Sequence, residues 1–108
     1  IRVGKVAVKV IHTPGHTQDS ICLEVDGALL TGDTLFVGEC GRTDLQGGNS
    51  ADMYNSLNKI ARLDRKLKVY PGHNYGNRPY STLGEEIDTN YTLRPRSKEE
   101  FMRFMLEP

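Results

Sequence analysis

Two histidines and one aspartate occupy matching places in this sequence, and their side chains are of the kinds that bind metal ions. His16 and His73 each follow a Pro-Gly pair, and Asp33 follows a glycine. Each comes directly after an apolar, strand-like run, at a tight turn. If these strands end at one rim of a sheet, two imidazoles and a carboxylate meet there. Since a carboxylate has two oxygens, Asp33 can bridge two metals about 3.5–4 Å apart.

Each imidazole also has an alternative interpretation, as a turn or core histidine whose nitrogens are satisfied by hydrogen bonds. The repeated placement of His16, Asp33 and His73 favours a shared metal site over three separate structural roles. The remaining histidine, His12, lies on the strand side of the first Pro-Gly turn. We therefore expect His12 to support the site or the fold rather than to bind metal.

The apolar pattern predicts the strands that must position these groups. Residues 5–11 alternate, with Val6, Val8 and Val10 on one face, and residues 20–25 repeat the pattern. Residues 26 and 27, Asp-Gly, predict a hairpin turn into a partner strand over residues 28–30. A short buried strand is expected over residues 67–70, and the glycine-rich stretch 35–48 is expected to be a loop.

Helical patterns separate and follow these strands. Ser50 is a candidate N-cap for a helix whose apolar face contains residues 53, 57, 60 and 61. Thr82 and Glu85 have capping-box spacing for a helix through about Tyr91. The same spacing at residues 97 and 100 predicts a last helix, whose residues 101, 104 and 105 we expect to be core contacts. Strands with interleaved helices indicate an α/β domain over residues 1–108.

The composition argues against a nucleic-acid-binding protein and against a membrane-spanning one. The 108 residues carry 14 basic and 14 acidic side chains, and no basic stripe indicates a nucleic-acid partner. No apolar run reaches the roughly 18 residues of a membrane-spanning helix, and we see no signal peptide. Two cysteines are too few for a disulfide framework, so we expect a cytoplasmic protein with free thiols. The chain starts at Ile1 inside a strand-like run, from which we expect a fragment.

Several segments together resemble one known family. Residues 12–17, 32–36, 40–44 and 71–75 are similar to motifs of the metallo-β-lactamase superfamily, as are residues 81–86 and Asn90. The nearest resemblance is to the glyoxalase II-type (hydroxyacylglutathione) hydrolases and the persulfide dioxygenases. It implies that His16 binds a first metal, that Asp33 bridges two metals and takes part in catalysis, and that His73 binds the second.

The chain departs from the family pattern at one place. The defining His-x-His-x-Asp-His motif, which in the family lies upstream of these segments, is not in the sequence. The resemblance therefore implies the C-terminal half of an αββα sandwich, with four metal ligands on an N-terminal half. We expect residues 1–108 alone to be inactive. We also expect an apolar sheet face to be exposed, and the chain to self-associate or to bind its missing N-terminal half.

The resemblance implies a hydrolase of small thioesters that uses two zinc ions in the complete site. One alternative is a persulfide dioxygenase with a mononuclear iron held partly by His16 and Asp33. Another is an inert fragment that only binds a partner. The expected substrate is a thioester or a glutathione-like thiol, with Arg42 and Tyr75 as substrate contacts. Arg42 can instead pair with Asp44. Arg78 is expected at the solvated surface and Cys40 in a structural role.

Overall fold

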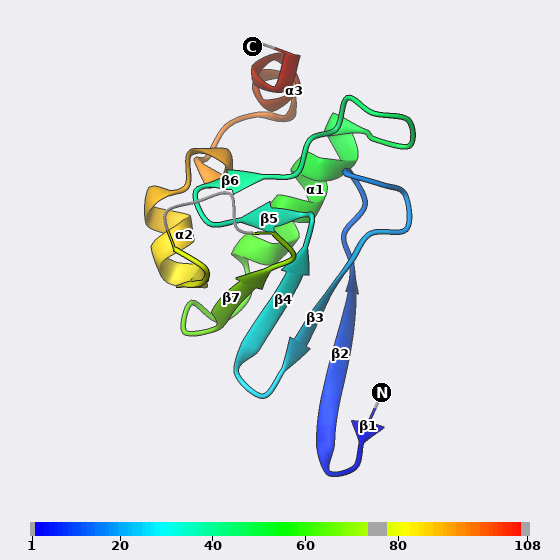
Figure 1. The fold of residues 1–108 in the computed structure, drawn as a ribbon. Helices are drawn as coiled ribbons and strands as arrows, with labels where there is room; N and C mark the ends of the chain where they lie inside the picture. The colour runs from blue at the N-terminus through cyan, green and yellow to red at the C-terminus, as the bar shows by residue number, and fades with distance from the viewer. Residues whose placement is uncertain (1, 74–77, 107–108) are drawn as a thin grey trace.

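The computed structural model describes residues 2–73 and 78–106. It contains a six-stranded sheet with the strand order β1-β2-β3-β4-β7-β8 and a separate two-stranded sheet of β5 and β6 (Figure 1). The strands are β1 (Arg2–Val3), β2 (Val6–His12), β3 (Ile21–Val25), β4 (Ala28–Gly32), β5 (Leu35–Phe36), β6 (Glu39–Cys40), β7 (Lys68–Pro71) and β8 (Ser81–Thr82). The helices are α1 (Ser50–Ala61), α2 (Leu83–Thr89), the 3-10 turn η1 (Tyr91–Leu93) and α3 (Lys98–Leu106).

The predicted hairpin is confirmed. Asp26 and Gly27 both have positive φ, 49° and 79°, and Val25 pairs with Ala28 across them. This turn has the twist that joins two antiparallel strands directly. β4 then pairs in parallel with β7, with Leu29 opposite Val69, after the chain has crossed through α1. The C-terminal ends of β4 and β7 therefore lie at the same end of the sheet.

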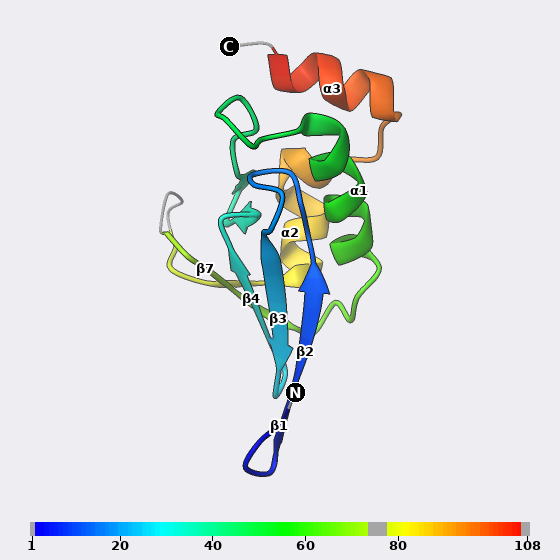
Figure 2. The same cartoon turned by 90° about the vertical axis from the view of Figure 1, so that its right-hand side faces the viewer.

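The core forms on one face of this sheet, where both α1 and α2 lie (Figures 1 and 2). The sheet contributes Ile11, Cys22, Leu29 and Val69 to one buried cluster. Three of these four have no exposed surface. Their helical partners are Met53, Leu57 and Ile60 of α1, Leu83 of α2 and Phe101 of α3. The predicted apolar stripe of α1 and the core role of Phe101 are thus confirmed, because these side chains pack together out of water.

The opposite face of the sheet is apolar and is not covered by any helix of the described residues. Val10 and Ile21 are 46% and 45% exposed, and Leu30 and Tyr70 are also exposed. Register places Val10 opposite Leu23, and Leu30 opposite both Leu23 and Tyr70, so these side chains form one continuous surface. The alternating valines of β2 therefore belong to this exposed face, and the neighbouring residue Ile11 supplies the core.

The prediction that residues 35–48 form only a loop is wrong. Leu35 pairs with Cys40, and Phe36 with Glu39, in a hairpin whose turn contains Gly38 at φ 82°. Leu35, Phe36 and Val37 are buried, which a solvent-facing loop would not allow. The short strands escaped prediction because their burial comes from contacts with distant elements rather than from a periodic pattern.

Two helix boundaries differ from expectation, and two are confirmed. Asn49, not Ser50, is the N-cap of α1, because its side chain accepts a hydrogen bond from the Asp52 N–H at 2.9 Å. α2 starts as predicted after Thr82, but it ends at Thr89 and gives way to η1 before Tyr91. At α3 the capping box is complete, with Ser97 and Glu100 each accepting the other's backbone N–H.

No helix in residues 2–73 or 78–106 has the length and apolar character that crossing a bilayer requires.

Candidate metal centre

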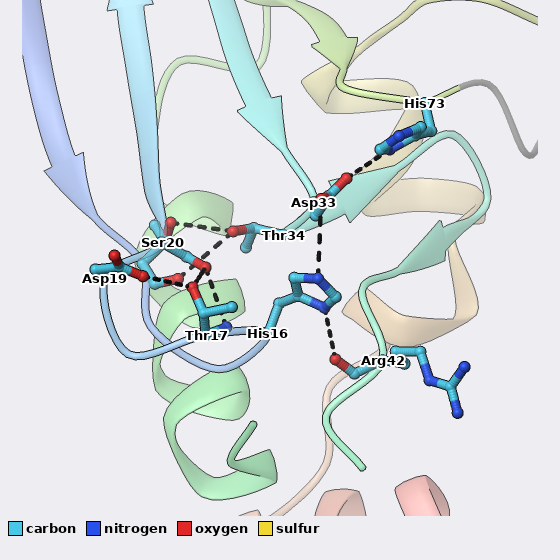
Figure 3. A network of polar contacts seen from close by, with 9 residues as sticks. His16, Thr17, Asp19, Ser20, Asp33, Thr34, Arg42 and His73 are labelled. Carbon is cyan, nitrogen blue, oxygen red and sulfur yellow. Dashed lines mark hydrogen bonds and ion pairs between the residues drawn. The ribbon is translucent and has the colours of Figure 1, made fainter. Parts of the chain in front are cut away.

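The structure brings His16, Asp33 and His73 together at the end of the sheet (Figure 3). Asp33 directly follows β4, His16 lies in the loop between β2 and β3, and His73 follows β7. The Nε2 atom of His16 is 3.8 Å from Oδ2 of Asp33. The Nδ1 atom of His73 is 2.7 Å from the other oxygen, Oδ1. Each carboxylate oxygen therefore faces a different imidazole.

The imidazole of His16 has a fixed orientation. Its Nδ1–H donates a hydrogen bond to the Arg42 carbonyl at 2.8 Å, which leaves Nε2 directed at Asp33. The preceding turn is tied to α1, where the Asn49 N–H donates to the Gly15 carbonyl at 2.7 Å. Gly15 has a φ of 146°, and a Cβ atom added to it would be only 2.6 Å from the Cα of Met53. Glycine at this position is therefore what lets the loop reach its place against α1.

Asp33 and His73 are held by a backbone contact between the two strand ends. The Gly72 N–H donates to the Gly32 carbonyl at 2.8 Å, so the two residues that follow lie side by side. A buried hydrogen bond of 3.1 Å between the hydroxyls of Thr13 and Thr34 links the Asp33 turn to the His16 loop. Backbone hydrogen bonds and buried side-chain contacts thus fix the positions of the three side chains.

A cavity of about 390 Å³ opens beside these three groups. Its lining contains them together with Phe36, Glu39, Cys40 and Arg42. The ring of Phe36 meets the ring of His73 edge to face, with centroids 6.4 Å apart. The hairpin of β5 and β6 therefore supplies an apolar and an acidic wall that the loop prediction missed. The β-favouring residues Phe36 and Val37, directly before Gly38, were the signal that could have revealed it.

The side chains of His16, Asp33 and His73 are of the types that bind a divalent metal, but they do not form a complete coordination shell. Two ligand atoms on one tetrahedral zinc ion are about 3.3 Å apart, given bonds of about 2.0–2.2 Å. The 3.8 Å between His16 and Asp33 is close to this separation, whereas the 2.7 Å between His73 and Asp33 is a direct hydrogen bond. Within residues 2–73 and 78–106, no three His, Cys, Asp or Glu side chains are arranged to hold an ion. Further ligands are required.

The remaining residues singled out from the sequence lie in different surroundings. Arg42 lines the cavity, and its guanidinium forms a two-point ion pair with Asp44 at 2.7 and 2.9 Å. That arginine holds the pKa of the Asp44 carboxyl below its usual range. Arg78 pairs with Glu85 at 2.7 Å on the surface. Tyr75 lies outside the described residues.

Two further side chains have structural contacts. His12 is exposed, its Nε2–H donates to the Gln18 carbonyl at 2.9 Å, and it does not line the cavity beside His16, Asp33 and His73. Cys40 is a free, buried thiol. Burial, with the nearby Glu39 carboxylate as a smaller cause, raises the Cys40 pKa from 9.0 to about 12. A thiol with such a pKa is protonated near neutral pH, so Cys40 is not an activated nucleophile.

Known proteins are similar to this chain in sequence and in fold. The hydroxyacylglutathione hydrolase of Anaeromyxobacter dehalogenans (strain 2CP-C) is 49% identical over 76 residues, which cover 69% of this chain and 29% of that protein. The mitochondrial persulfide dioxygenase ETHE1 of Mus musculus is 38% identical over an alignment of 111 positions that covers 97% of this chain and 42% of that protein. The crystal structure of ETHE1 from Myxococcus xanthus superposes with a TM-score of 0.90 at 39% identity, covering 100% of this chain and 50% of that one.

The chain thus spans half or less of the length of each of these proteins. The family model of the metallo-beta-lactamase superfamily matches residues 1–73, which include the positions of all three converging side chains. The solved structure covers the whole chain, so the fold resemblance extends past that match to the C-terminal helices. This chain belongs to the metallo-beta-lactamase superfamily.

Proposed function

We propose that the complete protein carrying this chain is a metal-dependent hydrolase of small thioesters. One observation carries the proposal: the two oxygens of Asp33 face different imidazoles, His73 and His16, at the wall of one cavity. A carboxylate placed in this way is suited to bridge two metal ions. The identity to a hydroxyacylglutathione hydrolase directs the proposal to thioesters.

The residues of this chain would hold the metals and position the substrate. His16 and His73 would each be a ligand of one ion, and Asp33 of both. Zinc suits these nitrogen and oxygen donors. Metal ions held by these residues would supply a water of lowered pKa and an electrophile for the substrate carbonyl. In the neutral imidazole of His16, the hydrogen bond to the Arg42 carbonyl selects the tautomer with its proton on Nδ1, which makes the lone pair of Nε2 available to a metal.

A thioester suits a site of this kind. Hydrolysis breaks the bond between the acyl carbon and sulfur, adds the oxygen of water to the acyl carbon, and releases a thiol. A thiolate is a good leaving group, so the reaction needs little help from a general acid. Arg42, on the cavity wall, can bind a carboxylate of a glutathione-like thiol when its guanidinium turns from Asp44. Tyr75 is the second proposed substrate contact, and a cytoplasmic location is part of the proposal.

We further propose that the chain is the C-terminal half of the domain and that the remaining ligands lie on an N-terminal half. This half would cover the exposed apolar face that includes Val10, Ile21 and Leu30. Contiguous apolar surfaces of this kind are usually covered by a partner. The greater length of the matched proteins supports this proposal. Without that half, residues 1–108 should self-associate and lack activity.

A second candidate function is persulfide oxidation with a single iron. It is favoured by the 38% identity to a persulfide dioxygenase over 97% of this chain. Two imidazoles and one carboxylate around open positions suit non-haem iron and dioxygen. His16 and Asp33 would then supply two of the three ligands. In this case His73 would not bind metal but would hold Asp33 through the 2.7 Å hydrogen bond.

Metal analysis and two activity assays on the complete protein separate these functions. Two zinc ions per chain with turnover of a hydroxyacylglutathione thioester support the hydrolase. One iron per chain with oxygen uptake on glutathione persulfide supports the dioxygenase and overturns the hydrolase. In a hydrolase, Asp33→Ala should remove metal from both positions, whereas His73→Ala should remove one. Full retention of metal by the Asp33→Ala variant rules out bridging.

A further inference from the structure

The helix α2 contains a buried carboxylate that the proposed reaction does not use. Glu86 is only 1% exposed, although glutamate is almost never fully buried unless it is paired. Its Oε1 atom accepts a hydrogen bond from the Gly38 N–H at 2.8 Å, and another from the Asn90 side-chain amide at 3.0 Å. Glu86 is thus directed at the turn of the hairpin formed by β5 and β6.

Asn90 extends this contact to both strands of the hairpin. Its Nδ2 amide lies 3.2 Å from the carbonyl oxygens of Phe36 and of Glu39, which are paired across the hairpin. Its own carbonyl oxygen accepts hydrogen bonds from the backbone and the hydroxyl of Thr92. Both ends of the Asn90 amide are therefore engaged, and the amide has a fixed orientation. Glu86 and Asn90 together hold the hairpin at its turn and at both strands.

The hairpin in turn reaches both imidazoles of the candidate metal centre. On its first strand, the Phe36 ring packs edge to face on the ring of His73. Beyond its second strand, the chain runs on to Arg42, whose carbonyl accepts the Nδ1–H of His16 at 2.8 Å. Between these two points the Gly41 N–H donates to the Thr34 carbonyl at 3.0 Å, next to Asp33. A displacement of the hairpin would therefore disturb both histidines.

We propose that Glu86, acting with Asn90, is a positioning residue for the metal centre. It fixes the β5–β6 hairpin, which sets the place of the His73 ring and the orientation of His16. This inference rests on the metal site of the proposed function, and it assigns to that site a residue outside the cavity lining. Loss of an outer partner of metal ligands typically weakens metal binding or activity about 10- to 100-fold.

Two conservative variants of the complete protein test this role. Glu86→Gln keeps a carbonyl oxygen where Oε1 lies, so it can still accept from Gly38 and Asn90. Glu86→Asp keeps the charge but withdraws the oxygen by about one carbon–carbon bond, roughly 1.5 Å, beyond hydrogen-bond reach of Gly38. Asp88→Asn is the matched control, because Asp88 is an exposed carboxylate on the same helix that pairs with Arg65 at 2.8 Å.

Two measurements are made on each variant. The first is zinc affinity, by competition with a chromophoric chelator. The second is the tautomer of His16 in metal-free protein, from the ¹⁵N chemical shifts of its ring nitrogens. We expect Glu86→Asp to bind zinc about 10-fold or more weakly and to lose the preference for the Nδ1–H tautomer. Glu86→Gln and Asp88→Asn should keep wild-type affinity and tautomer.

Each outcome decides the proposal. Wild-type zinc affinity and His16 tautomer in Glu86→Asp, with the fold confirmed by circular dichroism, would overturn it. Equal loss in Glu86→Gln and Glu86→Asp would also overturn it, because keeping the oxygen in its place would then not preserve the site. If the wild-type protein binds no zinc, the proposed function fails. In that case the tautomer measurement still decides whether Glu86 positions His16.

Discussion

Replacing Gly41 by alanine should disrupt the candidate centre from the hairpin side. A Cβ atom at this position would be 1.8 Å from the backbone carbonyl oxygen of Asp33 and 3.3 Å from the Cβ of His16. An ordinary van der Waals contact begins near 3.4 Å. The two backbone segments must therefore separate by about 1.6 Å, and no side-chain rotation can relieve the clash, because the nearest atom belongs to the main chain.

The size of the effect follows from what must move. Overpacking in a well-packed region typically costs about 1–3 kcal/mol, and a backbone collision belongs at the upper end of that range. Separation also stretches the 3.0 Å hydrogen bond from the Gly41 N–H to the Thr34 carbonyl, which contributes about 1 kcal/mol. Together these contributions should lower the free energy of unfolding of Gly41→Ala by about 4 kcal/mol, and the change should displace Asp33 beyond the roughly 0.5 Å tolerance of a functional site.

Urea unfolding of the metal-free complete protein measures the free energy, and elemental analysis measures the metal. Gly47→Ala is the matched control, because a Cβ at Gly47 meets nothing within 4 Å. The φ of 88° at Gly47 still destabilises alanine there by about 1–2 kcal/mol. The metal content of the Gly47→Ala variant should nevertheless equal that of the wild-type protein. A Gly41→Ala variant that is at least as stable as Gly47→Ala, or that keeps full metal content, would refute a backbone clash at this position.

Four further outcomes are expected. Native Cys40 should resist iodoacetamide near pH 8.5 and react once urea unfolds the protein, since its pKa of about 12 leaves almost no thiolate; rapid native labelling would contradict this. The pKa of Cys40 is higher in the folded protein than in the unfolded chain. The contribution of this thiol to stability is therefore complete below about pH 9 and is lost as the pH rises toward 12. Urea unfolding across this pH range measures the loss. Ser97→Ala should lower the free energy of unfolding by about 1 kcal/mol, because it removes the cap of α3. Asp44→Asn should leave the urea midpoint unchanged, because the ion pair between Asp44 and Arg42 is exposed.

Local features of the fold could be predicted because they depend on neighbouring residues. The hairpin at residues 26 and 27 requires only positive φ at two adjacent positions, and Asp-Gly satisfies this in any context. The capping box of α3 likewise involves residues only three apart. The placement of His16, Asp33 and His73 after strand-like runs was visible for the same reason, and it was enough to indicate that they meet.

Longer-range contacts decided the rest. The sequence does not show that Phe36 lies against the ring of His73, or that the Arg42 carbonyl orients His16. Nor does it show that Glu86, which the sequence places in an expected helix and in a family-like segment, reaches the Gly38 amide 48 residues away. Such contacts depend on the crossover that brings β7 beside β4, and no local pattern encodes that packing.

The two faces of the sheet show most clearly which features the sequence predicts and which depend on tertiary packing. Alternation in β2 and β3 revealed an apolar face that contains Val10 and Ile21, yet in this chain the helices cover the other face, through Ile11 and Cys22. A period of two residues separates the faces of a strand but does not say which one meets a helix. That choice depends on where α1 and α2 pack, and hence on the tertiary structure, because burial is a property of contacts between elements.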